Sequence, residues 1–442
     1  MKNLSTTTTK ILKNWLIDTR QRTRALYADL NSTQLLGPRL NIVNPPLWEI
    51  GHLAWFQEYW CLRNRGVDQA LLPSIFADAD ALYDSATVSL ASRWDLSLPD
   101  IEATQRYQDD VSNRVLERLD REPDNSALRY FAELAVYHED MHGEAFHYTR
   151  QTLGYPQPGL GATIQGLALG HAAPGATAHG DAEFCGGPYR LGADPNSVGF
   201  VFDNEKWSHD VFVEPFRMAK TTVSNGEFLA FVESDGYARR EFWSDAGSAW
   251  REHAQAQHPL YWRRRDGDWF IREFDQWRLL AERADAAIIF VNWFEAEAYC
   301  RFAKRRLPSE AEWEFAASGL EKRKRPWIEK SSPPEALPRA NLDGIRARSQ
   351  SASAFPGSDT PEGVRQLWGN VWEWTVDWLA SYPGFVRDPY KEYSEPWFGD
   401  HKVLRGGCFA TRSRLLRNTW RNFYTPDRRD VFAGFRTCAL GK

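Results

Sequence analysis

The sequence predicts a two-part fold, an α-helical bundle over residues 1–158 and an α+β domain over residues 184–442, joined by a linker over residues 159–183. In the first part, apolar residues recur with the period of an α-helix over long stretches. The linker is dense in Gly, Ala and Pro, which favour irregular backbone. After the linker, short strand-like runs alternate with turn residues, a pattern typical of an α+β domain with many loops.

Four long amphipathic segments account for the helical part. Asn44 is a capping-type residue, and the two prolines after it suit the first turn of a helix, where backbone amides have no partner. Asp100, directly after a proline, starts another helix. Four such segments predict an up-and-down bundle. The expected helices are residues 11–30, the segment that opens at Asn44, residues 99–122 and residues 128–154. In the second part, helices are expected at residues 225–234 and 293–306.

Composition excludes several classes of function. The chain has 442 residues and a formal net charge of −5, whereas a nucleic-acid surface needs a concentrated basic face. The five cysteines are widely scattered and odd in number, which fits a reducing compartment better than a disulfide framework. No stretch approaches about 18 consecutive apolar residues, and Asp18 and Arg20 interrupt the first segment. We therefore expect a cytoplasmic protein without nucleic-acid or membrane partners.

Three histidines form the most informative pattern of the helical part. His138 and His142 are one helical turn apart, so their imidazoles project from the same side of one helix. Apolar neighbours turn both toward an interior, where an imidazole without a partner is costly. His52 continues an apolar face of another helix, together with Trp48 and Phe56. Three inward histidines predict a metal site in a bundle, although each alone also fits a hydrogen-bonded core histidine. The spacing does not identify the metal.

Three motifs of the second part are specific. They are VNWFEAEAYCRFAKRRLPSEAEWEFAA at residues 291–317, GNVWEWT at residues 369–375 and RGGCFATRSRLLRNTWRNFYTPDRRDVFAGFR at residues 405–436, with further matches at residues 199–216 and 382–407. They resemble the formylglycine-generating-enzyme/sulfatase-modifying domain, which has a C-type-lectin-like fold. The helical part, with its three histidines, resembles a DinB-type four-helix bundle. This domain order is similar to that of the iron-dependent sulfoxide synthases of ergothioneine and ovothiol biosynthesis, and the resemblance covers essentially the whole chain.

The resemblance implies a metal centre and its chemistry. In that family three histidines bind non-haem iron(II), and the matching residues here are His52, His138 and His142. Three neutral imidazoles leave open positions on one face of the ion, which suit dioxygen, an anionic chalcogen donor and an imidazole substrate together. Two acidic neighbours, Glu139 and Asp140, either orient the histidines or lie on the solvated helix surface.

The resemblance also implies an active site in the crevice between the two domains. Asn422, Phe423 and Tyr424 match a C-terminal loop that lies at the mouth of the metal pocket, around the substrate hercynine. A tyrosine is expected as the proton source. Tyr390 is the first candidate and Tyr382 the second, and each is alternatively a packing tyrosine.

Departures from the family pattern concern the chalcogen donor. Met141 precedes the last histidine where relatives carry a glutamine that contacts substrate, and Tyr424 replaces an aspartate that would meet a donor amine. Arg93, the candidate donor contact, lacks the basic residues that precede it in peptide-using members. Because a phenol is neutral at pH 7, this pocket fits an uncharged selenosugar or thiosugar better than an amino acid. The pattern resembles the selenoneine synthase branch, which implies carbon–selenium or carbon–sulfur bond formation on hercynine with iron(II) and O2.

Other functions are alternatives. An ergothioneine sulfoxide synthase would use cysteine or γ-glutamylcysteine as donor. A DinB-type thiol transferase would use zinc or nickel, and a lectin-like module on a metal-stabilised bundle would bind without catalysis. Formylglycine generation is excluded because it needs a cysteine pair shortly after the Arg-Gly-Gly motif at 405–407, where Thr411 and Leu416 stand. Cys408 and Cys438 have another spacing and are expected to be small buried side chains.

Overall fold

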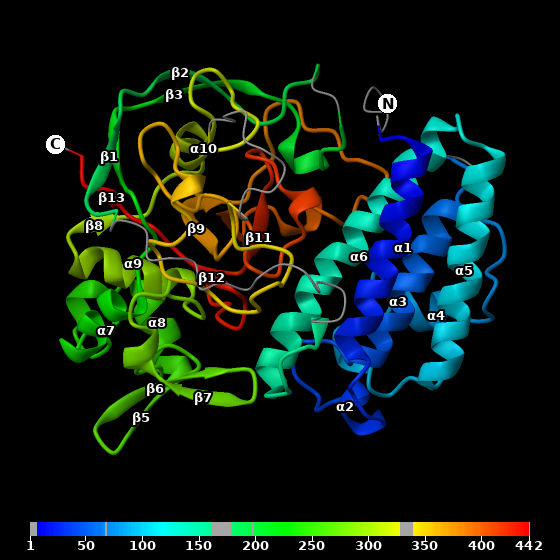
Figure 1. The fold of residues 1–442 in the computed structure, drawn as a ribbon, viewed down its shortest axis with the longest axis horizontal. Helices are drawn as coiled ribbons and strands as arrows, with labels where there is room; N and C mark the ends of the chain where they lie inside the picture. The colour runs from blue at the N-terminus through cyan, green and yellow to red at the C-terminus, as the bar shows by residue number, and fades with distance from the viewer. Residues whose placement is uncertain (1–6, 67–68, 161–177, 197–198, 328–338, 442) are drawn as a thin grey trace. The chain divides into compact units, whose positions relative to one another are not determined.

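The computed structural model describes residues 7–66, 69–160, 178–196, 199–327 and 339–441. By its internal contacts the chain divides into two units, Met1–Thr163 with Asn196–Phe200, and Ile164–Pro195 with Val201–Lys442. The first unit is helical and the second contains the sheets (Figure 1). The predicted order of a helical part followed by an α+β part is therefore confirmed.

Four long helices that pack against one another build the described part of the first unit (Figure 1). They are α1 (Thr9–Tyr27), α3 (Pro46–Glu58), α5 (Ile101–Arg121) and α6 (Ser126–Leu153). α1 packs along α6, and α3 contacts both α5 and α6. Two short helices lie in the connections, α2 (Ser32–Leu36) and α4 (Ala79–Tyr83). The predicted four-helix bundle is confirmed.

Capping residues explain where two of these helices begin and end. The Asp100 side chain accepts a hydrogen bond from the Ala103 amide at the start of α5, which confirms the predicted cap. The Asn125 side chain caps α6 in the same way. α6 ends at Gly154, whose φ of 66° lies in the left-handed region that glycine favours. These ends set the length of the helix that carries two of the three histidines.

The predicted cap of α3 is wrong. The residue before α3 is Pro45, and no side chain caps the helix. Asn44 Oδ1 instead accepts a hydrogen bond from Arg93 Nη1 at 2.5 Å. The start of α3 is therefore held by an arginine from a distant segment, which local sequence does not reveal. At its other end α3 continues into a π-helical turn, Tyr59–Arg63.

Two four-stranded sheets lie in the described part of the second unit. One has the order β1 (Asp181–Phe184), β4 (Phe216–Ala219), β13 (Cys438–Ala439) and β8 (Arg305–Arg306), all antiparallel. The other has the order β11 (Asn422–Tyr424), β10 (Lys402–Arg405), β9 (Trp372–Trp378) and β12 (Ala433–Gly434), in which β12 and β9 are parallel. The remaining strands pair as β2 (Gly187–Leu191) with β3 (His209–Val213), and as the meander β5 (Trp262–Arg265), β6 (Asp268–Glu273) and β7 (Gln276–Leu279).

Helices of the second unit follow local signals closely. They are α7 (Asn225–Glu233), α8 (Asp245–Ala254), α9 (Trp293–Phe302) and α10 (Glu310–Ser318). α7, α9 and α10 each begin with a reciprocal capping box. α7 and α9 confirm the predicted helices, except that α9 ends at Phe302 and the following residues enter β8. α8 has no counterpart among the predicted helices.

The predicted linker overlaps a strand at its end. β1 begins at Asp181 and pairs with β4, so residues 181–183 belong to a sheet. Residues 161–177, which make up most of the predicted linker, lie outside the described residues.

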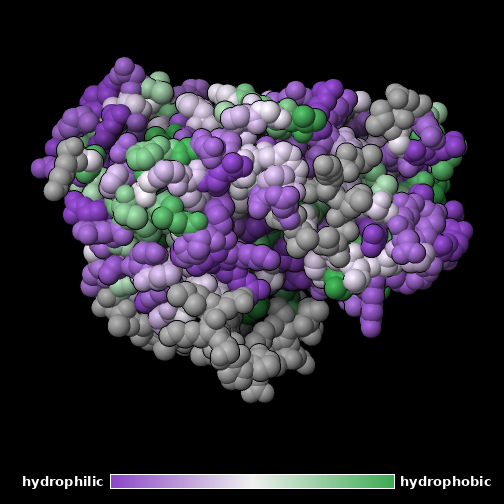
Figure 2. Space-filling model, turned by 90° about the horizontal axis from the view of Figure 1, so that it is seen from above, coloured by the Kyte–Doolittle hydropathy of each residue, from purple (hydrophilic) through white to green (hydrophobic). Residues whose placement is uncertain are grey.

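Large aromatic side chains are mainly internal. Trp48 in the first unit, and Trp313 and Trp374 in the second, are essentially inaccessible to solvent. The face drawn in Figure 2 is mostly hydrophilic, and its hydrophobic residues occur in small separate groups. Within the described ranges, no helix combines the length and the apolar character needed to cross a membrane.

Candidate metal centre

The three predicted histidines come together inside the helical unit. His52 lies on α3, and His138 and His142 lie one turn apart on α6. Their candidate ligand nitrogens all lie within 4.8 Å of one another. The ring centroids are 4.5 Å apart for His138 and His142, and that of His52 lies 5.1 and 5.2 Å from these two. Packing of α3 against α6 thus gathers three imidazoles from two helices, as predicted.

A backbone carbonyl fixes the orientation of His52. His52 Nδ1 donates a hydrogen bond to Tyr83 O at 2.8 Å, because a carbonyl can only accept. The Nε2 lone pair is therefore available for a metal ion. Tyr83 approaches this closely because residue 51 is glycine: a Cβ on Gly51 would lie 2.3 Å from atoms of the Tyr83 ring.

Replacing Gly51 by Ala is therefore expected to lower both stability and metal affinity. The added Cβ would displace Tyr83 together with the carbonyl that orients His52, and overpacking of this kind costs roughly 1–3 kcal/mol. Gly143→Ala is the matched control, since its Cβ would meet only Leu26, at an ordinary 3.7 Å. Denaturant unfolding and metal titration of both variants measure the difference. Equal behaviour of the two would contradict the role given to Gly51.

Glu49 is the partner of His142, and the sequence interpretation missed it. Glu49 Oε1 lies 2.5 Å from His142 Nδ1 and accepts its hydrogen, which again leaves the Nε2 lone pair for a metal. Glu49 is fully buried, and its second carboxylate oxygen has no hydrogen-bond partner. Glu49 and His52 are three residues apart on α3, a spacing that puts both on one helix face. That spacing is the signal by which the sequence could have revealed Glu49.

Aromatic rings pack against two of the three imidazoles. The His138 ring stacks on Phe56, with centroids 3.6 Å apart and planes 2° from parallel. The His52 ring stacks against Trp48 at 4.9 Å and Trp55 at 5.6 Å. These contacts restrict rotation of the two imidazoles and exclude water from their faces.

The electrostatics of the site favour metal binding. Burial lowers the pKa of His52 and His138 well below 6.5, and the neighbouring histidines lower it further because like charges repel. Neutral imidazole is the form that binds a divalent metal ion. The residues present therefore fit a metal: three nitrogen donors lie together, and two of them are already oriented by hydrogen-bond acceptors.

A further buried histidine provides a pH test of this unit. His147 on α6 is fully buried, its Nδ1 donates to Gly143 O at 2.8 Å, and burial lowers its pKa to about 3. Below about pH 6.5 the unfolded chain binds a proton at this residue that the folded chain does not bind. The stability contribution is therefore fully present at neutral pH and is lost as pH falls toward 3.

From pH 7 to pH 5, His147 alone is expected to lower the free energy of unfolding by about 2 kcal/mol. Denaturant unfolding of the metal-free protein at both pH values measures the total change. The difference between the wild type and His147→Asn isolates this residue. The same pH dependence in both proteins would contradict the prediction.

Glu139 and Asp140 connect α6 to α1. Both are buried, so the expectation of a solvated surface is wrong. Glu139 forms an ion pair with Arg20 of α1 at 2.9 Å, and Asp140 Oδ1 accepts a hydrogen bond from Thr19 of α1 at 2.9 Å. These contacts join α6 to α1, whereas the orienting contacts of two of the histidines come from α3 and α4.

Arg93, the predicted donor contact, lies buried against α3. Its guanidinium carbon is 3.6 Å from the Trp48 ring centroid. Nη1 donates to Asn44 Oδ1 at 2.5 Å and Nη2 to Val88 O at 3.1 Å. The terminal nitrogens are thus bound within the helical unit itself. Met141 is half-buried on α6, directly before the last of the three histidines.

The predicted substrate residues of the second unit form a strand instead of a loop. Asn422, Phe423 and Tyr424 make up β11, which pairs with β10 so that Tyr424 lies opposite Lys402. The expectation of a loop is wrong because β10, an element remote from the local motif, supplies the ladder partners. All three residues are half-buried. Asn422 Oδ1 accepts a hydrogen bond from the Phe423 amide at 2.9 Å.

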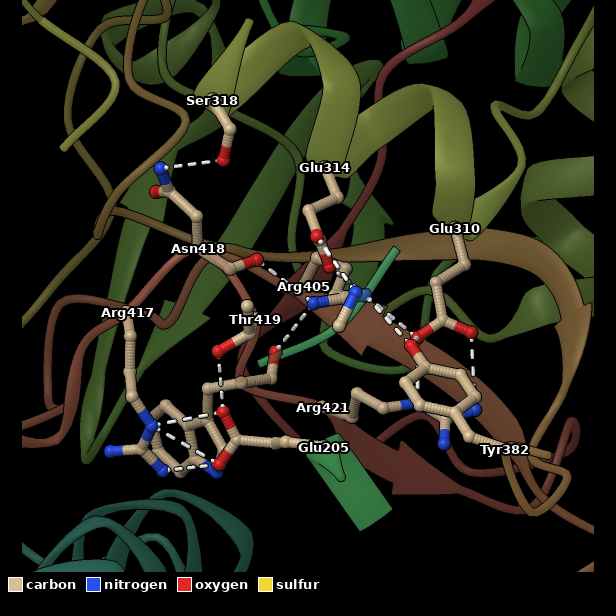
Figure 3. A network of polar contacts seen from close by, with 12 residues as sticks. Glu205, Glu310, Glu314, Ser318, Tyr382, Arg405, Arg417, Asn418, Thr419 and Arg421 are labelled. Atoms are coloured by element: carbon tan, nitrogen blue, oxygen red, sulfur yellow. Dashed lines mark hydrogen bonds and ion pairs between the residues drawn. The ribbon is translucent and has the colours of Figure 1, made fainter. Parts of the chain in front are cut away.

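Tyr382 belongs to a buried polar network (Figure 3). Its hydroxyl donates to Glu310 Oε1 at 3.0 Å, and the Arg421 guanidinium lies 4.3 Å from its ring centroid. Glu310 also accepts from Arg405 at 2.8 Å. Burial raises the pKa of Tyr382 well above 10. Tyr390, in contrast, is half-buried.

Two family models match the chain, one in each part. The model of the DinB superfamily matches residues 16–145, and that of the sulfatase-modifying factor enzyme 1-like domain matches residues 175–439. The hercynine oxygenase of Mycolicibacterium thermoresistibile is 35% identical over 435 residues, which are 96% of this chain and 94% of that protein. The chain belongs to the hercynine oxygenase family.

Another member of the hercynine oxygenase family, from Mycolicibacterium smegmatis, is 34% identical over 427 residues, 94% of this chain and 96% of that protein. The formylglycine-generating enzyme of Streptomyces coelicolor is 30% identical over 306 residues, 61% of this chain and 92% of that protein. The resemblance to the sulfoxide synthase family is thus confirmed, while the selenoneine branch stays a prediction.

This member of the hercynine oxygenase family has no thiol at the two positions where formylglycine generation would need cysteines. Thr411 is buried there, and its Oγ1 accepts a hydrogen bond from the Cys408 amide at 2.8 Å; Leu416 is the other residue. Cys408 and Cys438 are buried and outside any disulfide of the described residues, which confirms their prediction as small internal side chains. Burial raises the pKa of the Cys438 thiol to about 12.

Proposed function

We propose that this chain joins hercynine to a selenosugar or thiosugar donor, forming a carbon–selenium or carbon–sulfur bond with dioxygen as the oxidant and iron(II) at His52, His138 and His142. One observation carries the proposal: three inward imidazoles, two kept neutral by burial, in an oxidoreductase family whose named members are hercynine oxygenases. Iron(II) would supply a redox-active cation with coordination positions left for dioxygen and the donor.

The residues around the histidines prepare the site. The Glu49 carboxylate and the Tyr83 carbonyl hold the Nδ1 hydrogens of His142 and His52, so two Nε2 lone pairs need no reorganisation. Phe56 holds the third imidazole by stacking. A site preorganised in this way keeps the reactants within bonding distance at little entropic cost.

The assignment of an uncharged donor is supported by the surroundings of Tyr424. The Arg428 guanidinium, which also pairs with Asp430, lies 5.5 Å from the Tyr424 ring centroid, and Lys402 lies opposite Tyr424 in the ladder. A donor ammonium near Tyr424 would meet a neutral phenol and the Arg428 guanidinium, and the nearby Asp430 carboxylate is already paired with that guanidinium. Sugar hydroxyls can bond to the phenol and bring no charge that must be desolvated.

We assign the proton source to Tyr390 in preference to Tyr382. The Tyr382 hydroxyl is already donated to Glu310 inside a buried network, and burial raises its pKa well above 10. Transfer of that proton would leave a buried phenolate beside the Glu310 carboxylate and would break this hydrogen bond. Tyr390 is half-buried, so a charge left on its oxygen would be partly solvated.

An ergothioneine-type sulfoxide synthase is the second candidate, because the named relatives are hercynine oxygenases. It differs from the first in the donor, which would be cysteine or γ-glutamylcysteine. Both candidates share the metal site and hercynine.

Oxygen consumption tests the proposal. Iron-loaded protein is expected to consume oxygen only when hercynine and a chalcogen donor are both present, and zinc-loaded protein is expected to consume none. Oxygen uptake that does not depend on hercynine would contradict the proposal. Donor transfer without oxygen uptake would favour a thiol transferase, and hercynine binding without turnover would favour a binding protein.

A further inference from the structure

We infer that Arg93 and Glu49 are positioning residues of the metal centre, and that Arg93 acts through Trp48 instead of contacting the donor. This inference rests on the proposed metal role of the three histidines. It concerns residues that are buried within the helical unit, where all the contacts that support it lie.

The Arg93 guanidinium already donates hydrogen bonds within the protein. Only 9% of Arg93 is exposed, and its two terminal nitrogens donate to Asn44 Oδ1 and Val88 O. A donor carboxylate would have to displace these hydrogen bonds, each made by a buried group that then needs a new partner. Arg93 is therefore built into the start of α3.

Through Trp48, Arg93 reaches the metal histidine of α3. The guanidinium carbon lies 3.6 Å from the Trp48 ring centroid, and the Trp48 ring stacks on His52 at 4.9 Å with planes 11° apart. Trp48 Nε1 donates to Leu82 O at 2.7 Å, directly before the residue whose carbonyl orients His52. A cation–π contact is stronger when both groups are shielded from water, so this contact can hold the indole ring in place. Arg93 thus holds the indole that forms one wall of the site.

Glu49 acts on the metal site directly, through His142. One Glu49 oxygen lies 2.5 Å from His142 Nδ1, and the other is buried without a hydrogen-bond partner. Glu49 and Trp48 are neighbours on α3, so the helix that carries His52 also carries the group that orients His142. Glu49 therefore positions His142, as Trp48 positions His52.

Iron(II) affinity, measured by anaerobic equilibrium dialysis, tests the inference without requiring turnover. Glu49→Gln is expected to weaken iron(II) binding about 10–100-fold, the usual effect of removing a carboxylate that orients a metal-binding histidine. Arg93→Met is expected to weaken it by about tenfold, and Arg93→Lys, which restores the charge but not the planar stack, by less. The absorption bands of bound Co²⁺ should shift in Glu49→Gln, because the His142 nitrogen becomes a weaker donor.

Two control variants remove equally buried charges elsewhere in the helical unit. Glu58 lies on the same helix as Glu49 and is fully buried, but its partners are Ser74, Ile75 and Tyr107. Arg150 is also buried and pairs with Asp29. Glu58→Gln and Arg150→Met are expected to bind iron(II) within about twofold of the wild type. Denaturant unfolding of all variants separates loss of fold from loss of affinity, and if Arg93→Met does not fold, Arg93→Lys carries the comparison.

The Michaelis constant for the donor at saturating iron distinguishes the two roles of Arg93. A positioning residue changes the iron affinity and leaves this constant nearly unchanged. A wild-type iron affinity in the Arg93 variants, combined with a raised Michaelis constant for the donor, would overturn the inference. If the wild type binds iron but turns over no hercynine, the proposed function fails, whereas the affinity comparison still decides the roles of Glu49 and Arg93.

Discussion

His138→Ala is expected to lose metal binding and turnover together. His138 contributes one of three nitrogens that lie within 4.8 Å of one another, and two remaining neutral ligands hold a divalent ion weakly. The variant should retain less than about a tenth of the wild-type iron after anaerobic loading and desalting, and should form no detectable product. Metal content by mass spectrometry and product formation from hercynine measure the two effects.

His147→Asn is the control for this experiment. His147 lies on the same helix and is equally buried, but it hydrogen-bonds to Gly143 O and is not part of the cluster. This variant should retain one iron per chain and full activity. One iron per chain and full activity in His138→Ala would show that the three histidines are not the ligands.

The choice of chalcogen donor is expected to change the catalytic rate by a similarly large factor. A 1-selenosugar is expected to be used well, its sulfur analogue more slowly, and cysteine or γ-glutamylcysteine hardly at all. Each donor carboxylate or ammonium that lacks a partner is desolvated at a cost of roughly 1–3 kcal/mol, hence about tenfold to more than a hundredfold in kcat/KM. A selenol is also a stronger acid than a thiol, so more of it is in the nucleophilic anionic form at pH 7.

The variant Tyr424→Asp tests whether residue 424 sets this preference. A carboxylate at this position would pair with a donor ammonium, so the ratio of kcat/KM for γ-glutamylcysteine to that for the selenosugar should rise by about tenfold. Tyr424→Phe, which removes only the hydroxyl, should slow both donors without raising the ratio. If the wild type turned over γ-glutamylcysteine at or above the selenosugar rate, the chain would belong to the ergothioneine branch instead.

The helices of the first unit could be predicted because local signals define them. The apolar period gives their faces, and a side-chain cap such as Asp100 marks where one begins. The spacing of His138 and His142 puts both on one side of α6, so two of the three donors follow from local sequence. The inward position of His52 could also be predicted, because an amphipathic helix such as α3 generally packs by its apolar face.

Contacts between distant segments could not be predicted in the same way. Asn44 has the sequence of a cap, yet it binds Arg93, because a buried guanidinium needs acceptors more than this helix start needs a cap. Glu139 stands next to a histidine in sequence, but a helix turns adjacent residues by about 100°, so it faces α1 instead. The spacing of Glu49 from His52 places its carboxylate on the same face of α3, but only the tertiary packing shows that it orients His142.

Short elements of the second unit also could not be predicted from their local sequence. Residues 422–424 contain no alternating pattern long enough to predict β11, and the strand forms because β10 offers ladder partners. α8 was not predicted, although Ser244 caps it as Ser224 caps α7. Short elements in a loop-rich domain depend on their neighbours more than on their own sequence.

The most direct test of the account is the mass of the product formed from ring-deuterated hercynine. Iron-loaded protein, air and a 1-selenosugar are expected to give one new compound that contains both reactants and has lost one ring deuterium, because the new bond replaces a carbon–hydrogen bond of the imidazole. The His138→Ala protein should give none. Hercynine recovered with all its ring deuterium from protein that holds one iron per chain, with every donor tried, would contradict the account.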